Sequence, residues 1–202
     1  MAGRLSPDAR RAQIIAVTRR LIAEHGPSGL SMRAIARACD MTGPGIAHHF
    51  PTLGDLLMTV MSERDHEYAA AILEEVRAHG EDMSLLLAVD TMVRYYAQRP
   101  RETRNFQLLL AAAMDPAHPA HPYVAHRPRG RELTVPLAER DYVDPVGVMN
   151  VLSLVIDGLN SRWFIAPEMP DMWADWQAVR RPLFNGFVRK DGRLTIPDPP
   201  AA

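Results

Sequence analysis

Apolar residues recur at helical spacing along most of this chain, and no convincing strand pattern interrupts them. The spacing is clearest in residues 14–22, 53–76 and 85–96, where apolar side chains return every three or four positions. Residues 144–165 are apolar on almost every side, and residues 172–187 carry one broad apolar face. Helices of this kind must be covered by other helices or by a second chain. The pattern therefore predicts an all-α protein with about nine helices.

The composition is that of a globular protein with a sizeable core. Of the 202 residues, 47% are hydrophobic and 23% are charged, which excludes the disordered and fibrous classes. The first residues, MAGRLSPDARR, lack the apolar core of a signal peptide, so none is expected. The most apolar stretch, residues 146–156, is broken by Asn150 and closed by Asp157, so no membrane span is expected either. The single cysteine, Cys39, fits a reducing compartment. We therefore expect a cytoplasmic protein.

Charge is distributed unevenly along the chain. Residues 1–50 contain seven arginines and three acidic side chains, a net charge of +4, whereas the rest of the chain carries −5. A basic N-terminal part on an acidic body is typical of a small module that meets a polyanion, joined to a larger part with another task. We predict a first domain over residues 1–51, a second over residues 52–192, and a loose, proline-rich tail over residues 193–202.

Residues 31–50, SMRAIARACDMTGPGIAHHF, have the size and rhythm of a helix-turn-helix. Ser31 caps a first short helix, and Thr42 caps a second one that Phe50 and Pro51 end. The capped start of the second helix presents free backbone N–H groups and a positive dipole end to phosphates, with base edges just beyond. The motif therefore favours binding to double-stranded DNA.

Motifs of the common enzyme classes are absent from the sequence. It has no GxSxG, no GxxxxGK[ST], no strand-flanked GxGxxG and no complete HExxH. Three histidines, His118, His121 and His126, have spacings that suit a metal, but they lie in a stretch with four prolines, residues 115–128. Because Asp115 is the only acidic partner at ligand spacing, a solvated loop with a broken helix is the simpler interpretation. We expect no enzymatic activity, no cofactor and no metal.

From Ile14 to Met61 the chain resembles the TetR family of ligand-responsive transcriptional regulators. The similarity rests on the order of its parts: an apolar helix ending in EHG, then LSMRAIA, a turn, HHFP, and a helix that opens near DLL. A weaker likeness, VIDGLNSRWFIAP over residues 155–167, is similar to the penultimate helix of many members. The resemblance implies an Ω-shaped homodimer with three N-terminal helices of each subunit on DNA. It also implies an effector pocket in the remaining helices and a four-helix dimer interface formed by the last two helices of each subunit.

The same resemblance implies which residues contact DNA. Ser31 and Thr42 match cap positions that touch phosphates, and Arg33 matches a position that reaches a phosphate or a guanine edge. The start of the recognition helix and its exposed face are matched by Gly43, Pro44, Gly45, Ala47, His48 and His49. The chain departs from the pattern at Ala47, where the family usually has tyrosine, and at Leu53, where a lysine is frequent. Readout is therefore expected to rest on Arg33, the two histidines and DNA shape.

Two further sets of residues are assigned only as regions. Apolar and aromatic residues of the middle helices are candidates for lining the effector pocket, and they favour a hydrophobic or aromatic small molecule. This set is Tyr68, Met92, Tyr95, Tyr96, Phe106, Leu109, Leu110, Met114, Met149 and Leu152. The candidate dimer interface consists of Val155, Leu159, Trp163, Trp176, Val179, Leu183 and Phe187. For any single member of either set, ordinary core packing is an open alternative.

These observations predict a sequence-specific DNA-binding transcriptional regulator, a repressor that a small molecule releases from a palindromic operator. Release requires that the ligand bind more tightly to the state of the protein that cannot bind DNA. The alternative is a helical small-molecule binding protein whose helix-turn-helix no longer selects an operator. The departures at Ala47 and Leu53 support that alternative.

Overall fold

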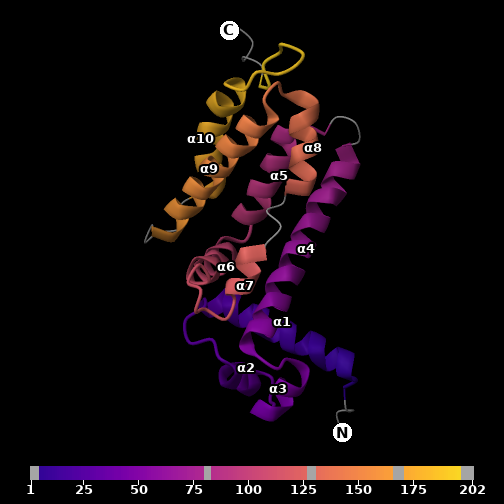
Figure 1. Ribbon diagram of the computed structural model, residues 1–202, viewed down its shortest axis with the longest axis vertical. Helices are drawn as coiled ribbons and strands as arrows, with labels where there is room; N and C mark the ends of the chain where they lie inside the picture. Colours follow the sequence, from indigo (N-terminus) through magenta and orange to yellow (C-terminus); the bar gives the residue numbers. More distant parts are fainter. Residues whose placement is uncertain (1–4, 80–82, 127–130, 166–170, 197–202) are drawn as a thin grey trace. The chain divides into compact units, whose positions relative to one another are not determined.

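The structure is a computed structural model that describes residues 5–79, 83–126, 131–165 and 171–196 (Figure 1). Within these ranges the chain folds into ten α-helices, and its β-structure is limited to one isolated bridge between Tyr142 and Arg189. The predicted all-α fold class is confirmed. In the same ranges no helix is both long enough and apolar enough to cross a membrane. The helices are α1 (Pro7–His25), α2 (Met32–Ala38), α3 (Gly43–His49), α4 (Leu53–His79), α5 (Leu85–Ala97), α6 (Pro100–Ala112), α7 (His121–His126), α8 (Arg131–Asp141), α9 (Pro145–Ile165) and α10 (Met172–Asn185).

The chain divides into two compact units, and α4 contributes to both. The first unit comprises Met1–Glu67 and Arg101–Arg127, and it contains α1 to α3, the first part of α4, α6 and α7. The second comprises Tyr68–Pro100 and Pro128–Ala202, and it contains the rest of α4 with α5, α8, α9 and α10. The sequence predicts domain boundaries after residues 51 and 192. That residues 1–51 and 52–192 fold as separate domains stays a prediction.

The first three helices each begin at a capping residue, and those of α2 and α3 are the ones that the sequence predicts. The hydroxyl oxygen of Ser6 accepts a hydrogen bond from the N–H of Ala9, and Ser31 and Thr42 each accept one from the third residue ahead, all over 3.2 Å. Each bond satisfies a backbone donor that the first turn of a helix leaves without an intrahelical partner. Local sequence thus sets the starts of α1, α2 and α3.

One apolar core holds the first unit together. Ile14 and Ile22 from α1 pack there with Ile35 of α2 and Ile46 of α3, and all four side chains are 0% exposed. Helix α6 adds Phe106, which is buried in the same core. Because α2 and α3 have only seven residues each, neither is stable alone, and this shared core sets their geometry.

Helix α4 begins with a reciprocal capping pair. The N–H of Asp55 donates to the hydroxyl of Thr52, and the N–H of Thr52 donates to the carboxylate of Asp55, each over 3.1 Å. Gly54 lies so close to the proline-rich segment that a Cβ atom there would approach the carbonyl oxygen of Pro119 to 2.8 Å. That segment consists of turns followed by α7, in agreement with the predicted loop and broken helix.

A second apolar core lies among α5, α8, α9 and α10 (Figure 1). Its centre is aromatic, with the rings of Trp176 and Phe184 meeting edge to face at a centroid distance of 6.2 Å. Both of these side chains are fully buried. Helix α8 was not indicated by the sequence pattern, because Pro136 lies inside it and a proline usually ends a helix.

The chain after α10 folds back onto the second unit. The side-chain amide of Asn185 donates to the carbonyl of Ile196 and accepts from its N–H, each over 2.9 Å. The hydroxyl groups of Tyr142 and Thr195 lie 3.1 Å apart. These bonds hold Thr195 and Ile196, and the loose tail over residues 193–202 stays a prediction. Residues 197–202 of that tail lie outside the described residues.

Candidate nucleic-acid interface

The turn between α2 and α3 is closed by backbone hydrogen bonds. The N–H of Met41 donates to the carbonyl of Ala36 over 2.9 Å, and the N–H of Asp40 donates to that of Arg37 over 3.2 Å. This pair of bonds is a Schellman motif, which needs a left-handed residue after the helix. Asp40 supplies it with a φ of 52°, and it is the one non-glycine residue with a positive φ in the described ranges. The motif fixes the angle at which the chain leaves α2 to start α3.

A concave surface of about 920 Å³ lies between α2 and α3. Four residues predicted to contact DNA line it together: Arg33, Thr42, Gly43 and Ala47. The same surface includes the exposed side chains of Arg37 and Asp40, which add one charge of each sign. The structure therefore brings the central part of the predicted contact set onto one face.

The remaining predicted contacts lie at the starts and at the end of the two helices. Ser31 and Pro44 are exposed, and Gly45 is half-buried. At the end of α3, His48 is exposed and His49 is half-buried, with their rings edge to face at a centroid distance of 5.4 Å. His48 is thus available to a partner, whereas much of His49 is covered.

Two glycines at the start of α3 have different surroundings. A Cβ atom on Gly45 would lie 3.2 Å from the hydroxyl oxygen of Thr42, which caps the helix. A Cβ atom on Gly43 would meet no described atom within 4 Å. Contacts within the chain therefore do not require glycine at position 43, and the missing side chain leaves the backbone there open to a close partner.

The family of this helix-turn-helix follows from a comparison with protein-family models. Residues 14–58 match the family described as bacterial regulatory proteins, tetR family. These residues are a tetR-family segment. The segment spans most of α1, all of α2 and α3, and the start of α4, and it includes every residue predicted to contact DNA. The resemblance seen in the N-terminal part of the sequence is confirmed.

Solved structures of similar fold extend over nearly the whole chain. The multidrug binding protein EbrR in complex with imidazole is 21% identical, with a TM-score of 0.62 over 94% of this chain and 97% of that chain. NalD of Pseudomonas aeruginosa, the secondary repressor of the MexAB-OprM multidrug efflux pump, is 19% identical, with a TM-score of 0.62 over 91% and 98%. EbrR in complex with malachite green is 24% identical, with a TM-score of 0.59 over 85% and 96%. These similarities show a shared fold, and no curated protein matches the sequence.

Arg11 of α1, which precedes the tetR-family segment, contacts the far end of α3. Its Nη1 donates to the backbone carbonyl of His49 over 2.9 Å. The guanidinium carbon also lies 4.0 Å from the centroid of the Phe50 ring. Sequence reasoning missed this contact because Arg11 and His49 are 38 positions apart, and helical periodicity carries no information on such pairs.

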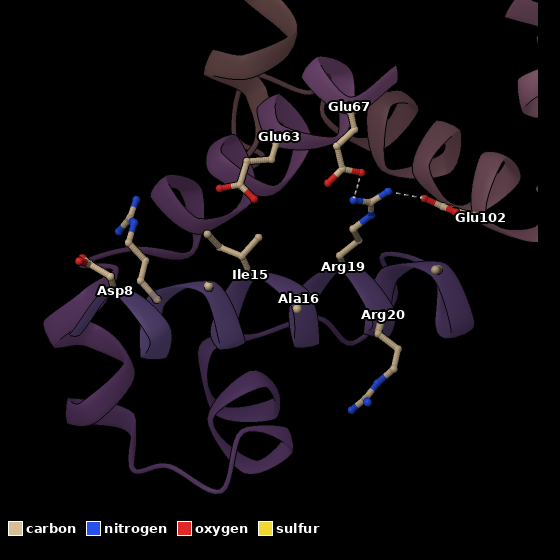
Figure 2. Close-up of a pocket in the computed structure, with 11 residues that line it drawn as sticks. Asp8, Ile15, Ala16, Arg19, Arg20, Glu63, Glu67 and Glu102 are labelled. Carbon is tan, nitrogen blue, oxygen red and sulfur yellow. Dashed lines mark hydrogen bonds and ion pairs between the residues drawn. The ribbon is translucent and has the colours of Figure 1, made fainter. Parts of the chain in front are cut away.

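A second concave surface, of about 570 Å³, lies in the same unit and is lined by residues of α1, α4 and α6 (Figure 2). Figure 2 shows Arg19 of the tetR-family segment between Glu67 and Glu102, and it pairs with both carboxylates. Burial by itself lowers the pKa of Arg19, but the hydrogen bonds and charges of the two carboxylates outweigh burial and raise the pKa above its ordinary value. Arg19 thereby ties α1 to α4 and α6, a role that the sequence did not indicate.

The histidines of the proline-rich segment take part in local hydrogen bonds. Nδ1 of His121 lies 3.0 Å from the carbonyl oxygen of Ala113, and Nδ1 of His126 lies 2.8 Å from that of Pro122. Among the residues that the structure describes, no group of three or more histidine, cysteine, aspartate or glutamate side chains is placed to hold a metal ion.

The residues predicted to line an effector pocket divide between the two cores. Phe106, Leu109 and Leu110 are buried in the core that holds the tetR-family segment, and Met114 is 70% exposed. The other six residues, Tyr68, Met92, Tyr95, Tyr96, Met149 and Leu152, pack in or against the second core. The pocket itself stays a prediction.

Three tyrosines form the most compact part of the predicted pocket set. Tyr68 stacks on Tyr96 with ring centroids 5.0 Å apart, and Tyr95 meets Tyr68 edge to face at 5.2 Å. The guanidinium of Arg99 lies 4.2 Å from the centroid of Tyr95. Tyr68 and Tyr95 are half-buried, so this aromatic triad keeps part of its surface open.

The residues predicted to form a dimer interface differ in burial. Val155, Val179, Leu183 and Phe187 are half-buried, Leu159 is buried, and the side chain of Trp163 lies outside the described part of the chain. Trp176 is 0% exposed, so it has no surface for a second chain, and its assignment changes from interface to core.

Three other apolar residues of α9 are more exposed than the described members of the predicted set. Val146, Val151 and Leu154 are 68%, 40% and 73% exposed. The sequence did not single them out, because a helix that is apolar on almost every side shows no preferred face.

Proposed function

We propose that this chain is a DNA-binding transcriptional repressor that recognises a roughly palindromic operator as a homodimer and leaves it when a small molecule binds. The observation that carries the proposal is the concave surface between α2 and α3, where Arg33, Thr42, Gly43 and Ala47 lie together within a tetR-family segment. NalD, which shares the fold, is a repressor, and this supports the assignment of repression.

Phosphate contacts are assigned to the starts of α2 and α3. The hydroxyl oxygens of Ser31 and Thr42 accept hydrogen bonds from their own helices, which leaves each O–H group able to donate outward. Donors at such positions fix the register of a protein on the duplex without reading its sequence. In this proposal the two residues orient α3 against the DNA backbone.

Base readout is assigned to Arg33 and His48, which are both exposed. An arginine guanidinium matches the O6 and N7 acceptors of guanine in the major groove. Gly43 and Ala47 offer no side-chain hydrogen bonds, so the rest of the specificity is assigned to close backbone approach and to sequence-dependent DNA shape.

A second copy of this chain is the proposed partner of α9. Val146, Val151 and Leu154 leave large apolar surfaces exposed on that helix. Contact between equivalent helices about a two-fold axis buries the same residues on both subunits. A symmetric dimer in turn accounts for the proposed palindromic operator, because each subunit reads one half-site.

The proposed effector is a hydrophobic or aromatic small molecule. The aromatic triad of Tyr68, Tyr95 and Tyr96 supports this class, since partly open tyrosine rings favour planar ligands. EbrR, which shares the fold, is a multidrug binding protein seen in complexes with proflavin and malachite green. The proposal assigns no catalytic step to the chain.

Selection of bound fragments from a random pool of duplex DNA tests the proposal, followed by a salt titration on the enriched sequence. We expect an inverted repeat whose half-sites are about one helical turn apart, or slightly more. The salt titration separates phosphate contacts from base contacts, because only the former release counterions. The enriched duplex then serves as the probe for a screen of aromatic effectors.

Binding that depends on salt without any enriched sequence would refute the operator-specific function. It would instead favour the alternative, a small-molecule binding protein whose helix-turn-helix has lost its selectivity. The exposed Ala47 is consistent with that alternative, since it leaves α3 with a small contact surface.

A further inference from the structure

The geometry points to Arg11 as a positioning residue for DNA recognition, one that holds the C-terminal end of α3 from α1 without contacting bases itself. The inference rests on the proposed DNA-binding function. It adds a residue outside the helix-turn-helix, and outside the predicted contact set, to the machinery that orients the recognition helix.

The end of α3 needs an external hydrogen-bond donor. The last carbonyl groups of any helix lack intrahelical partners, and they form the negative end of the helix dipole. In α3 the N–H of Phe50 donates to the carbonyl of Ile46 over 2.9 Å, and the next residue, Pro51, has no N–H to offer. The guanidinium of Arg11 donates to the carbonyl of His49 over 2.9 Å. A cation at this end of a helix is favoured both by the hydrogen bond and by the dipole.

Arg11 is itself held at a second point. Its guanidinium carbon lies 4.0 Å from the centroid of the Phe50 ring, and Phe50 is 1% exposed and belongs to the core of the first unit. The helix that carries Arg11 is anchored in the same core by Ile14 and Ile15. A rigid ring on one side and a carbonyl on the other thus leave the guanidinium little freedom.

The two contacts of Arg11, with the carbonyl of His49 and with the Phe50 ring, form a brace that determines the direction of the exposed end of α3. His48 and Ala47, two of the predicted contacts, directly precede the carbonyl that Arg11 binds. Since α3 has only seven residues, a shift of its last turn moves these side chains relative to a base edge. Loss of the brace is therefore expected to reduce operator selectivity while the fold persists.

The neighbouring Arg10 provides a matched control. Its Nη1 donates to the side chain of Gln13 over 2.7 Å, so this hydrogen-bond partner lies on its own helix, α1. R10Q therefore removes the same charge from the same turn without releasing α3. The comparison between R11Q and R10Q separates the brace from the charge.

The experiment uses the full chain and two duplexes, the sequence enriched by selection and an unrelated one. We expect R11Q to weaken binding to the enriched duplex at least tenfold, and R10Q less than threefold. Both variants should weaken binding to the unrelated duplex by the same small factor. The imidazole resonances of His48 and His49, followed by NMR in the absence of DNA, should shift in R11Q and stay in place in R10Q.

Circular dichroism will detect any loss of folding in R11Q. If R11Q is unfolded, a third variant, R11K, tests the inference in its place. Lysine keeps the charge and a donor for the carbonyl of His49 but lacks the flat face that lies against Phe50. R11K is expected to bind the unrelated duplex as the wild type does and the enriched duplex severalfold more weakly. Wild-type affinity of R11K for both duplexes would overturn the inference.

Two further results would also overturn the positioning role. If R11Q weakens binding to both duplexes by the same factor and lowers the slope of the salt dependence by about one, Arg11 is a phosphate contact. If the histidine resonances stay in place in R11Q, the brace does not set the end of α3. Failure of the wild type to select any sequence refutes the proposed function instead, and the NMR comparison then decides the role of Arg11 alone.

Discussion

Trp176 donates its indole N–H to the carboxylate of Asp90 over 2.6 Å, and the two side chains are only 0% and 5% exposed. The other carboxylate oxygen of Asp90 pairs with Arg180, so one buried acid joins α5 to two residues of α10. Removal of a buried charge leaves its partners with unsatisfied donors, which costs more than the pair contributes. Asp90 is therefore a principal link between α5 and α10.

Replacement of Asp90 by alanine tests this link. We expect Asp90→Ala to lower the free energy of unfolding by about 2–4 kcal/mol, because the indole N–H and the guanidinium lose their buried acceptor. Urea unfolding at one fixed protein concentration measures the change, since dimerisation would shift apparent stability. Asp157→Ala removes an exposed carboxylate from α9 and should stay within about 0.5 kcal/mol of the wild type. Equal effects in the two variants would contradict the proposed link.

Arg33 is expected to carry the strongest base contact. Arg33→Ala should weaken binding to the selected operator by about 1–3 kcal/mol and relax specificity at one position of each half-site. Fluorescence anisotropy on the operator and on single-base variants of it measures both effects. Arg20→Ala removes an equal charge from α1 and serves as the control. Unchanged operator affinity in Arg33→Ala would refute the assigned role.

The left-handed conformation of Asp40 destabilises the fold, and substitutions can separate this strain from the effect of the Asp40 charge. Asp40→Gly should stabilise the chain by about 0.5–1 kcal/mol, because glycine adopts a positive φ without a steric penalty. Asp40→Asn removes the charge and should give a smaller gain, since asparagine also tolerates this conformation. Both variants should bind duplex DNA more tightly at low salt, as each removes a negative charge from the surface that includes Arg33. Thermal unfolding and a salt titration measure the two effects, and equal stability of both variants would reject the strain argument.

Among the side chains of α9 that the structure describes, Leu154 is the most exposed large apolar residue, at 73%. Leu154→Glu should raise the dissociation constant of the proposed dimer on the order of 1000-fold, because both subunits of a symmetric dimer carry the substitution in the interface. Sedimentation velocity measures the dissociation, and circular dichroism should show unchanged helicity. Met114→Glu alters a residue of similar exposure in the other unit and should leave the dimer intact. A Leu154→Glu variant that remains dimeric would exclude this face of α9.

Asp191 provides a test by pH. Arg189 donates two hydrogen bonds to its carboxylate and Arg193 donates one from its backbone, which lowers the pKa of Asp191 to about 2. A carboxyl group with a pKa lower in the folded chain than in the unfolded one stabilises the fold above the unfolded value, and this contribution is lost as pH falls from about 4 toward 2. NMR titration of the carboxyl carbon should therefore give a midpoint near 2. Arg189→Ala should move the midpoint up toward the ordinary value of 3.8, and an unmoved midpoint would contradict the assigned cause.

Local chemistry was sufficient for much of the fold. The caps at Ser31 and Thr42 are formed as expected, because a cap involves residues only three positions apart. The helix-turn-helix was predicted in the same way, from caps and a turn that lie next to each other in the chain. Trp176 of α10, predicted for the dimer interface, is instead fully buried, because a broad apolar face does not show which of its residues the core of the same chain covers.

The sequence by itself determined the all-α class, the starts of the first helices and the family of residues 14–58, since these depend on short-range hydrogen bonds and on residue order. Only the tertiary structure decided which side chains meet across the chain. The contact of Arg11 with His49 spans 38 positions, and that of Asp90 with Trp176 spans 86. Such pairs form because packed helices place them together, and no periodicity along the sequence encodes that placement.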